Sequence, residues 1–297
     1  MEKSHSIGSQ SELDAYRRAQ RIAYDCAEDV AGRLHSGISE REAAEMMRAY
    51  LTEHGINYYF HAPFVWFGER TELAITWGDD DFLPSEKRLE VGMPVILDVA
   101  PIVEGYAADI GYAFAFGANA QHEAMLADLE AYRVLIPKLL KEGRTMQEVY
   151  MAIDQRIKEQ GYMSSHHAYP AGVIGHRVTT LQPEGSADEA RAGGFGISAY
   201  RYLKDKKILS AKAPHLSPYW NDSHLSAHAP EVGLWAVEPH FARDGIGVKF
   251  EELLVVTESD VFWLDDELPH VQRWKRSAAQ PTSQPPRRPP HLEIASS

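Results

Sequence analysis

Two aspartates in a predicted β-hairpin are the residues of this sequence with the clearest chemical potential. Asp98 lies in the apolar run 94–100 and Asp109 in the run 106–114, and Pro101 and Gly105 mark the turn between the runs. If residue 98 is opposite residue 109, both carboxylates point to one face of the hairpin. Buried carboxylates so placed repel each other, so they need a shared proton, basic side chains or a cation. The alternative is that they are two unrelated aspartates at strand ends.

Three strand-like runs in the second half of the chain carry further ligand types. His176 lies in the run 173–178, and a glutamate lies in each of the runs 234–239 and 247–256, namely Glu238 and Glu251. A lone histidine or glutamate in a strand is usually a core or solvent-facing residue. Together, however, the five residues suit two divalent cations that are bridged by carboxylates, with a water between them.

Composition limits the class of protein. The 297 residues are 44% apolar and 25% charged, which is typical of a globular chain with a sizeable core. The formal net charge of -13 argues against a nucleic acid or an anionic membrane as a partner. The single cysteine, Cys26, excludes a disulfide framework, and we find neither a membrane-spanning run nor a signal peptide. We therefore expect a cytoplasmic protein.

Two helical segments that match in length, start and stop frame the hairpin. They cover residues 37–55 and 143–161, and the second lies 106 residues after the first. Each begins with a capping box, which pairs Ser39 with Glu42 and Thr145 with Glu148. This indicates a duplicated helix-plus-strand unit, and two related halves would meet at a shared cleft.

The ends of the chain differ in composition from its middle. We expect a disordered N-terminus over residues 1–10, a catalytic domain over 11–273, and a Pro-rich disordered tail over 274–297. Residues 73–77 are predicted to form a short strand, and the three aspartates at 79–81 a solvated loop. A long insertion at 182–230, whose role the sequence leaves open, carries several histidines.

These features resemble the pita-bread metallopeptidase superfamily, which includes methionine aminopeptidase, Xaa-Pro aminopeptidase, prolidase and creatinase. The resemblance covers residues 11 to 270, and its motifs are Asp98-Val99-Ala100, Tyr106-Ala107-Ala108-Asp109, Gly175-His176, Glu238-Pro239 and Gly247-Val248-Lys249-Phe250-Glu251. It implies an α+β fold with twofold-related halves around a curved antiparallel sheet, and a homodimer. It also implies one or two divalent ions, with Mn, Fe or Co favoured and Zn acceptable, and their ligands would be Asp98, Asp109, His176, Glu238 and Glu251.

The sequence departs from the peptidase pattern around the substrate. Pro183 stands where the family carries a second histidine, and residues 72–84 lack the substrate-holding histidine that precedes the hairpin. We expect replacements for these groups in the cleft, and the candidates are Arg177, His240, His228 and His61. Arg177 would pair with a substrate carboxylate, unless it points to the far face of its strand and pairs with a structural acid.

Three functional classes follow from these observations. The first is a metal-dependent hydrolase that cleaves an amide, peptide or C–N bond of a small amino-acid-like substrate or short peptide, with Glu238 as general base. The second is a metalloenzyme with other chemistry on a small carboxylate substrate, such as elimination or iron-dependent oxidation. The third is a catalytically silent binding module, which the complete ligand set disfavours.

Overall fold

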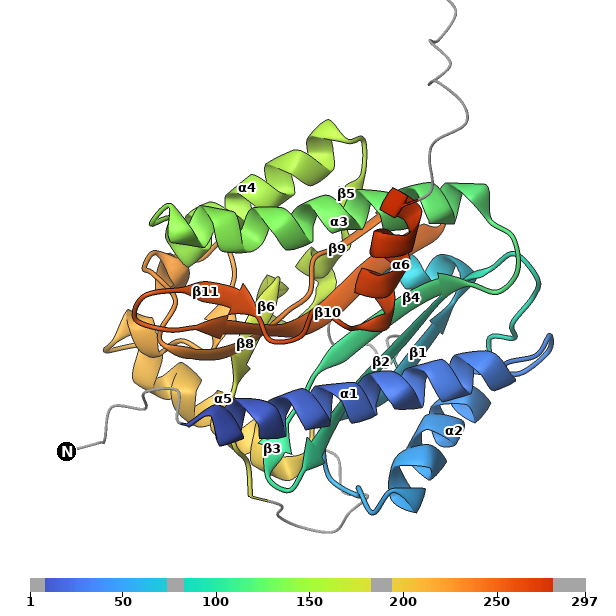
Figure 1. The fold of residues 1–297 in the computed structure, drawn as a ribbon, viewed down its shortest axis with the longest axis horizontal. Coiled ribbons are helices and arrows are strands. Elements are labelled where there is room, and N and C mark those ends of the chain that lie inside the picture. Colours follow the sequence, from blue (N-terminus) through green and yellow to red (C-terminus); the bar gives the residue numbers. More distant parts are fainter. Residues whose placement is uncertain (1–8, 74–82, 183–193, 280–297) are drawn as a thin grey trace, which may run out of the picture.

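A curved antiparallel sheet forms the centre of the protein, and helices cover its outer face (Figure 1). The computed structural model describes residues 9–73, 83–182 and 194–279. The main path of the sheet is β1 (Tyr59–Phe67), β2 (Pro94–Val103), β4 (Ile110–Ala115), β10 (Ile246–Val256), β8 (Gly233–Val237), β6 (Gly175–Val178) and β7 (Tyr219–Trp220). The shorter strands β3 (Tyr106–Ala107), β5 (Met163–Ser164), β9 (His240–Arg243) and β11 (Val261–Trp263) pair along it.

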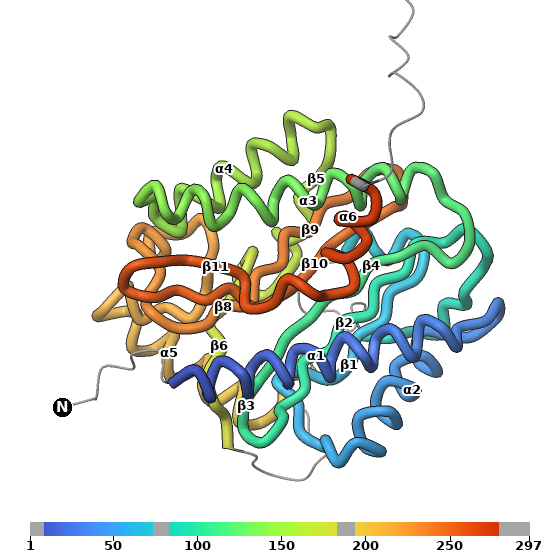
Figure 2. Tube along the Cα trace, viewed as in Figure 1, coloured from blue at the N-terminus to red at the C-terminus, as the bar shows by residue number. Residues whose placement is uncertain are grey.

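Two helix pairs reflect the predicted duplication. The first pair is α1 (Gln10–Arg33) with α2 (Glu40–Glu53), and the second is α3 (Ala120–Lys141) with α4 (Met146–Glu159). Both predicted capping boxes are present, at the starts of α2 and α4. The tube in Figure 2 shows the pairs on opposite edges of the molecule, with the strands between them. The expected fold of two related helix–strand halves is therefore confirmed.

The remaining helices are short or belong to the second half of the chain. α5 (Ile197–Ser210) occupies the predicted insertion, and α6 (Pro269–Ala279) closes the described part of the chain. The 3-10 helices are η1 (Gly68–Glu72), η3 (Ser165–Ala168), η4 (Pro170–Gly172), η6 (Pro214–Leu216) and η7 (His224–Ser226). None of the helices in the described residues has the length and apolar character that a membrane span needs.

The predicted hairpin is present, but its register is shifted by two residues. Asp98 pairs with Gly111 instead of Asp109, and Val103 pairs with Tyr106 across the turn. Glu104 and Gly105 have φ values of 52° and 88°, so the two-residue turn is of the primed kind that suits twisted hairpins. Because side chains in a strand alternate with period two, a two-residue shift keeps Asp109 on the face of Asp98.

Helix α6 corrects the predicted domain boundary at residue 273. Trp274 is only 6% exposed, and its indole N–H donates to the carbonyl oxygen of Leu126 in α3 at 3.0 Å. The folded domain therefore continues to at least residue 279. The predicted loop at 79–81, most of the predicted strand 73–77, residues 1–8 of the predicted N-terminus and residues 280–297 of the predicted Pro-rich tail lie outside the described residues.

Candidate metal centre

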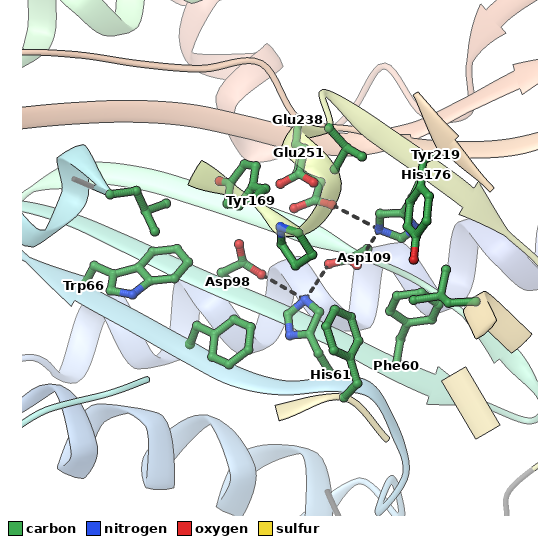
Figure 3. Close-up of a pocket in the computed structure, with 16 residues that line it drawn as sticks. Phe60, His61, Trp66, Asp98, Asp109, Tyr169, His176, Tyr219, Glu238 and Glu251 are labelled. Carbon is green, nitrogen blue, oxygen red and sulfur yellow. Dashed lines mark hydrogen bonds and ion pairs between the residues drawn. The ribbon is translucent and has the colours of Figure 1, made fainter. Parts of the chain in front are cut away.

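Five residues from distant parts of the sequence converge in the middle of the curved sheet (Figure 3). They are the predicted ligands, called the ligand set below: Asp98, Asp109, His176, Glu238 and Glu251. None is more than 8% exposed. Ligand atoms of Asp109, His176 and Glu251 lie within 4.8 Å of one another, and so do those of Asp98, Glu238 and Glu251. The structure thus brings together all five residues that the sequence singled out.

Strand register explains how the acidic members meet. Asp98 on β2 and Glu251 on β10 both pair with Gly111 of β4, so the two carboxylates flank one central residue. Asp109 lies two residues before Gly111 and points to the same face (Figure 3). Three neighbouring strands therefore present three carboxylates to one space.

The other side of the site depends on a close approach of β6 and β8. His176 pairs with Ala236, and the backbone N–H of Glu238 donates to the carbonyl oxygen of Ile174 at 2.8 Å. A Cβ on Gly175 would lie 2.5 Å from the carbonyl oxygen of Ala236. Only glycine fits there, which gives the Gly-His motif a physical reason.

His61 and His176 each direct their Nε2 atom at Asp109. The Nδ1 atoms of His61 and His176 face backbone carbonyl oxygens, those of Ala62 at 2.8 Å and Arg177 at 3.4 Å. Their Nε2 atoms lie 3.0 Å from the two different carboxylate oxygens of Asp109. A neutral imidazole that donates from Nδ1 to a carbonyl presents its Nε2 lone pair, which is how histidine binds a metal.

Charge adjusts the pKa values of these groups. Burial alone lowers the pKa of His61, but the charges of Asp109 and Asp98 outweigh burial and raise that pKa well above its usual range. Burial likewise raises the pKa of Asp109, and the two imidazoles outweigh it and lower that pKa. Ionised carboxylate and cation thus stabilise each other at this position.

The donors present fit a divalent ion. Four carboxylates and two imidazoles converge, and this mixture of oxygen and nitrogen atoms suits Mn, Fe, Co or Zn. Both imidazoles have the carbonyl partner at Nδ1 that orients a metal-binding histidine.

Lys249 is the site residue that sequence reasoning missed. Its Nζ donates to Asp98 at 2.7 Å and to Glu238 and Glu251 at 2.9 Å each, and its side chain is fully buried. A Cβ on Gly111 would lie 2.3 Å from Cε of Lys249, so the glycine leaves space for the lysine. The signal was available, because residues 249 and 251 of one strand must point to the same face.

An aromatic pocket opens above the ligand set. Its walls are apolar and come from β1, the η4 region, the start of the α5 segment and β7; the principal residues are Phe60, Phe64, Trp66, Val173, Phe195 and Tyr219. The ring of Phe60 stacks on His176 at 4.8 Å between centroids, and the ring of Phe64 stacks on His61 at 4.6 Å. Among the described lining residues there is no arginine or lysine.

A family comparison decides what kind of protein carries this site. The family model described as "Metallopeptidase family M24" matches residues 14–258, which include every member of the ligand set. The chain belongs to metallopeptidase family M24. Divalent metals are the cofactors of this family, and its fold is the predicted pita-bread fold.

Individual relatives of this M24 chain are distant. It is 26% identical over 159 residues to an uncharacterized peptidase of Staphylococcus aureus strain MSSA476, which covers 53% of this chain and 43% of the relative. A relative from strain MW2 matches equally well. The chain therefore spans less than half the length of these curated relatives.

Solved structures share the fold. An X-Pro aminopeptidase from Thermotoga maritima MSB8 matches with a TM-score of 0.62 and 17% identity, over 86% of this chain and 61% of the other. A prolidase from Pyrococcus furiosus matches with a TM-score of 0.60 and 17% identity, over 86% of this chain and 64% of the other. The Xaa-Pro dipeptidase from Bacillus anthracis matches with a TM-score of 0.59 and 20% identity, over 86% of this chain and 61% of the other.

The expected role of Arg177 needs correction. Its guanidinium donates to the carboxylate of Glu231 and, at 2.9 Å, to the carbonyl oxygen of Val232, and it is absent from the pocket lining. His176 points into the site, so the next residue of the strand points to the other face. The structure thus pairs Arg177 with a structural acid and does not bring it to the substrate.

The three candidate histidines also separate. His61 lines the pocket, as expected. His240 is buried behind the site, where its Nε2 faces the carbonyl oxygen of Thr71 at 2.8 Å and its Nδ1 faces the hydroxyl of Tyr169 at 2.9 Å. His228 contacts backbone carbonyl oxygens of its own loop and is not part of the lining. The expectation that His240 and His228 line the pocket was wrong.

Proposed function

We propose that this M24 chain is a metal-dependent hydrolase that cleaves an amide, peptide or other C–N bond of a small amino-acid-like molecule or short peptide. One observation carries the proposal. The ligand set lies complete and buried at one end of an aromatic pocket, and Asp98, Asp109, His176, Glu238 and Glu251 all line that pocket. A substrate that enters the pocket would therefore meet the metal-binding groups directly.

The residues of the site have separate tasks in this proposal. A divalent ion held by the ligand set would supply Lewis acidity, which activates a water and polarises a carbonyl. Glu238 lines the pocket as the general base, and Lys249 fixes one of its carboxylate oxygens at 2.9 Å. His61 lines the pocket beside Asp98 and Asp109, where it would contact the substrate.

The pocket walls favour an apolar group next to the scissile bond. Aromatic rings bury apolar surface and exclude water from the reacting atoms. The expectation of a carboxylate-bearing substrate rested on Arg177, which lies elsewhere. We therefore place an apolar or aromatic side chain of the substrate against Phe64 and Trp66.

A mass-spectrometric assay with a panel of substrates tests the proposal. Chelated protein resupplied with Mn²⁺ would be incubated with methionyl and Xaa-Pro peptides, and with N-acyl and N-alkyl amino acids that carry apolar or acidic side chains. We expect metal-dependent release of an amine from members with apolar side chains. Absence of turnover across the panel, in protein shown to hold metal, would contradict hydrolysis.

Other chemistry on the same centre is the second candidate. Pro183 stands in place of the second histidine of the peptidase pattern, and this weakens the case for peptide cleavage. Elimination or iron-dependent oxidation of a panel member would appear as a product with a different mass. A silent binding module would bind panel members without converting any of them.

Cofactor identity, location and assembly belong to the same proposal. The mixed oxygen and nitrogen donors support Mn, Fe or Co, with Zn as an alternative. The single cysteine supports a cytoplasmic location, where disulfides are rare. A homodimer rests on the family resemblance alone, and analytical ultracentrifugation of the full chain tests it.

A further inference from the structure

We propose that Lys249 is a built-in cation that limits this centre to one tightly bound divalent ion, in place of a pair. This inference rests on the proposed function, because it concerns the metal that the ligand set would hold. Its basis is that a lysine ammonium already lies between three of the four carboxylates of the ligand set.

The contacts of Lys249 saturate its ammonium. A lysine ammonium has three N–H donors, and here three different carboxylates accept at 2.7 to 2.9 Å. Hydrogen bonds between charged partners are the strong ones, especially in a buried site. The lysine side chain has no exposed surface, so water does not compete for these donors. The ammonium is thus a full partner of Asp98, Glu238 and Glu251.

The surrounding fold makes room for this cation. Gly111 leaves space for the aliphatic stem of Lys249, since a Cβ there would lie 2.3 Å from Cε. The ring of Tyr169 lies 5.0 Å from Nζ, a cation–π distance. A missing side chain on β4 and an aromatic ring between η3 and η4 therefore both match a lysine at this position.

The groups that remain suit one ion. Asp109 and His176 make no contact with Lys249 among the hydrogen bonds of the described residues, and Glu251 uses only Oε2 for it. Together with Oε1 of Glu251, the oxygen that Lys249 does not contact, they form a three-residue site with open positions. A metal ion that is bound also by the carboxylate oxygens that Lys249 contacts would lie close to the ammonium. Like charges in a buried site repel strongly.

Counting bound ions tests this inference. The full chain is stripped with a chelator, and Mn²⁺ binding is then measured by titration calorimetry and by elemental analysis after gel filtration. We expect one tight ion per chain in the parent and in Lys249→Arg, which keeps the charge. We expect Lys249→Met to gain a second ion, because three carboxylates lose their partner. Lys87→Met is the matched control, since it removes a lysine that pairs with Glu69 at the surface; it should bind one ion.

Two results would overturn the inference. One is a parent that holds two tight ions, for example with the second between His61, Asp98 and Asp109. The other is a folded Lys249→Met that holds no more metal than the parent. If Lys249→Met does not fold, the number of anomalous Mn²⁺ peaks in parent crystals decides the matter. A parent that holds two ions and hydrolyses amides keeps the proposed function, whereas one that holds a single ion and converts nothing keeps only this inference.

Discussion

At the scale of single residues, Glu238 combines two roles, because it belongs to the ligand set and also lines the pocket. Glu238→Gln keeps the size and one ligand oxygen but loses the charge that accepts a proton. We expect kcat to fall by about 10²–10⁴ while the protein still binds metal, as measured by steady-state kinetics and elemental analysis on one sample. Glu231→Gln alters a carboxylate outside the pocket and should keep full activity. An unchanged kcat in Glu238→Gln would contradict the assignment of Glu238 as the general base.

Residue-level predictions from the sequence succeeded where a motif specified both type and strand. The convergence of the ligand set was predicted, since each member lies in an apolar run in which an ionisable residue needs a reason, and its metal-binding role stays a prediction. Lys249 was missed because its importance comes largely from Asp98 and Glu238, two carboxylates on other segments of the chain. The direction of Arg177 was left open, and only the pairing with Glu231 decided it.

At the scale of elements, the contact between β6 and β8 positions His176 relative to Glu238. Gly175→Ala places a Cβ 2.5 Å from the carbonyl oxygen of Ala236 and must push the strands apart. We expect a loss of about 1–3 kcal/mol in the free energy of unfolding, measured by denaturant titration, together with weaker metal binding. Gly32→Ala in α1 is the matched control, because its Cβ would meet nothing within 4 Å. That variant should gain up to about 1 kcal/mol. Equal stability of the two variants would contradict this account of the Gly-His motif.

We expect the free energy of unfolding to depend on pH because of His122 in helix α3. This residue is fully buried in the first turn, and within the described residues its ring nitrogens have no hydrogen-bond partner. Burial, assisted by the charge of Arg273, lowers the pKa of His122 to about 4. The unfolded chain therefore binds a proton at a higher pH than the folded chain. Stability should fall as the pH drops from about 6.5 towards 4, by an amount on the order of 3 kcal/mol.

Comparison of the parent with His122→Leu isolates that effect. Melting temperatures would be measured at pH 7 and at pH 5 for both proteins. We expect a smaller decrease for the variant, since leucine has no proton to bind. An identical decrease in both proteins would show that other groups control the acid response.

Elements were predictable where local chemistry determines them. The capping boxes predicted the starts of α2 and α4 because their hydrogen bonds are contained within four residues. The register of the hairpin was wrong by two residues, since the left-handed pair Glu104 and Gly105 forms the turn and the strands continue from there. Residues 274–279 of helix α6 were assigned to a tail because their burial depends on a contact with α3, which the local composition does not reveal.

At the scale of the whole molecule, the metal should link distant parts of the chain. The ligand set comes from both halves of the sheet, so a bound ion stabilises only the folded state. At a free Mn²⁺ concentration 100-fold above Kd, the gain is about 2.7 kcal/mol, and the melting temperature should rise by about 5–10 °C. The pKa of Asp109 is lowered in the folded state, so the contribution of this carboxylate is present at neutral pH and is lost in acid. A chelator that leaves the melting temperature of metal-loaded protein unchanged would contradict this linkage.

The whole fold was easier to predict than the substrate. The duplicated capped helices and the order of five ligands specify the architecture, because both are carried by sequence-local signals. The substrate depends on the pocket walls, which come from β1, the η4 region, the segment that leads into α5, and β7. Residues such as Phe195 and Tyr219 meet there only after folding.

Metal-restored turnover by the parent and by Asp109→Ala tests the central claim most directly. Asp109 contacts both imidazoles, so its loss should abolish tight metal binding. With the best substrate of the panel, chelated parent should be inactive and should recover hydrolysis when Mn²⁺ is added, whereas Asp109→Ala should remain at least about 100-fold slower at the same Mn²⁺ concentration. Hydrolysis by the parent that survives chelation, or equal recovery by Asp109→Ala, would contradict a metal-dependent hydrolase at this site.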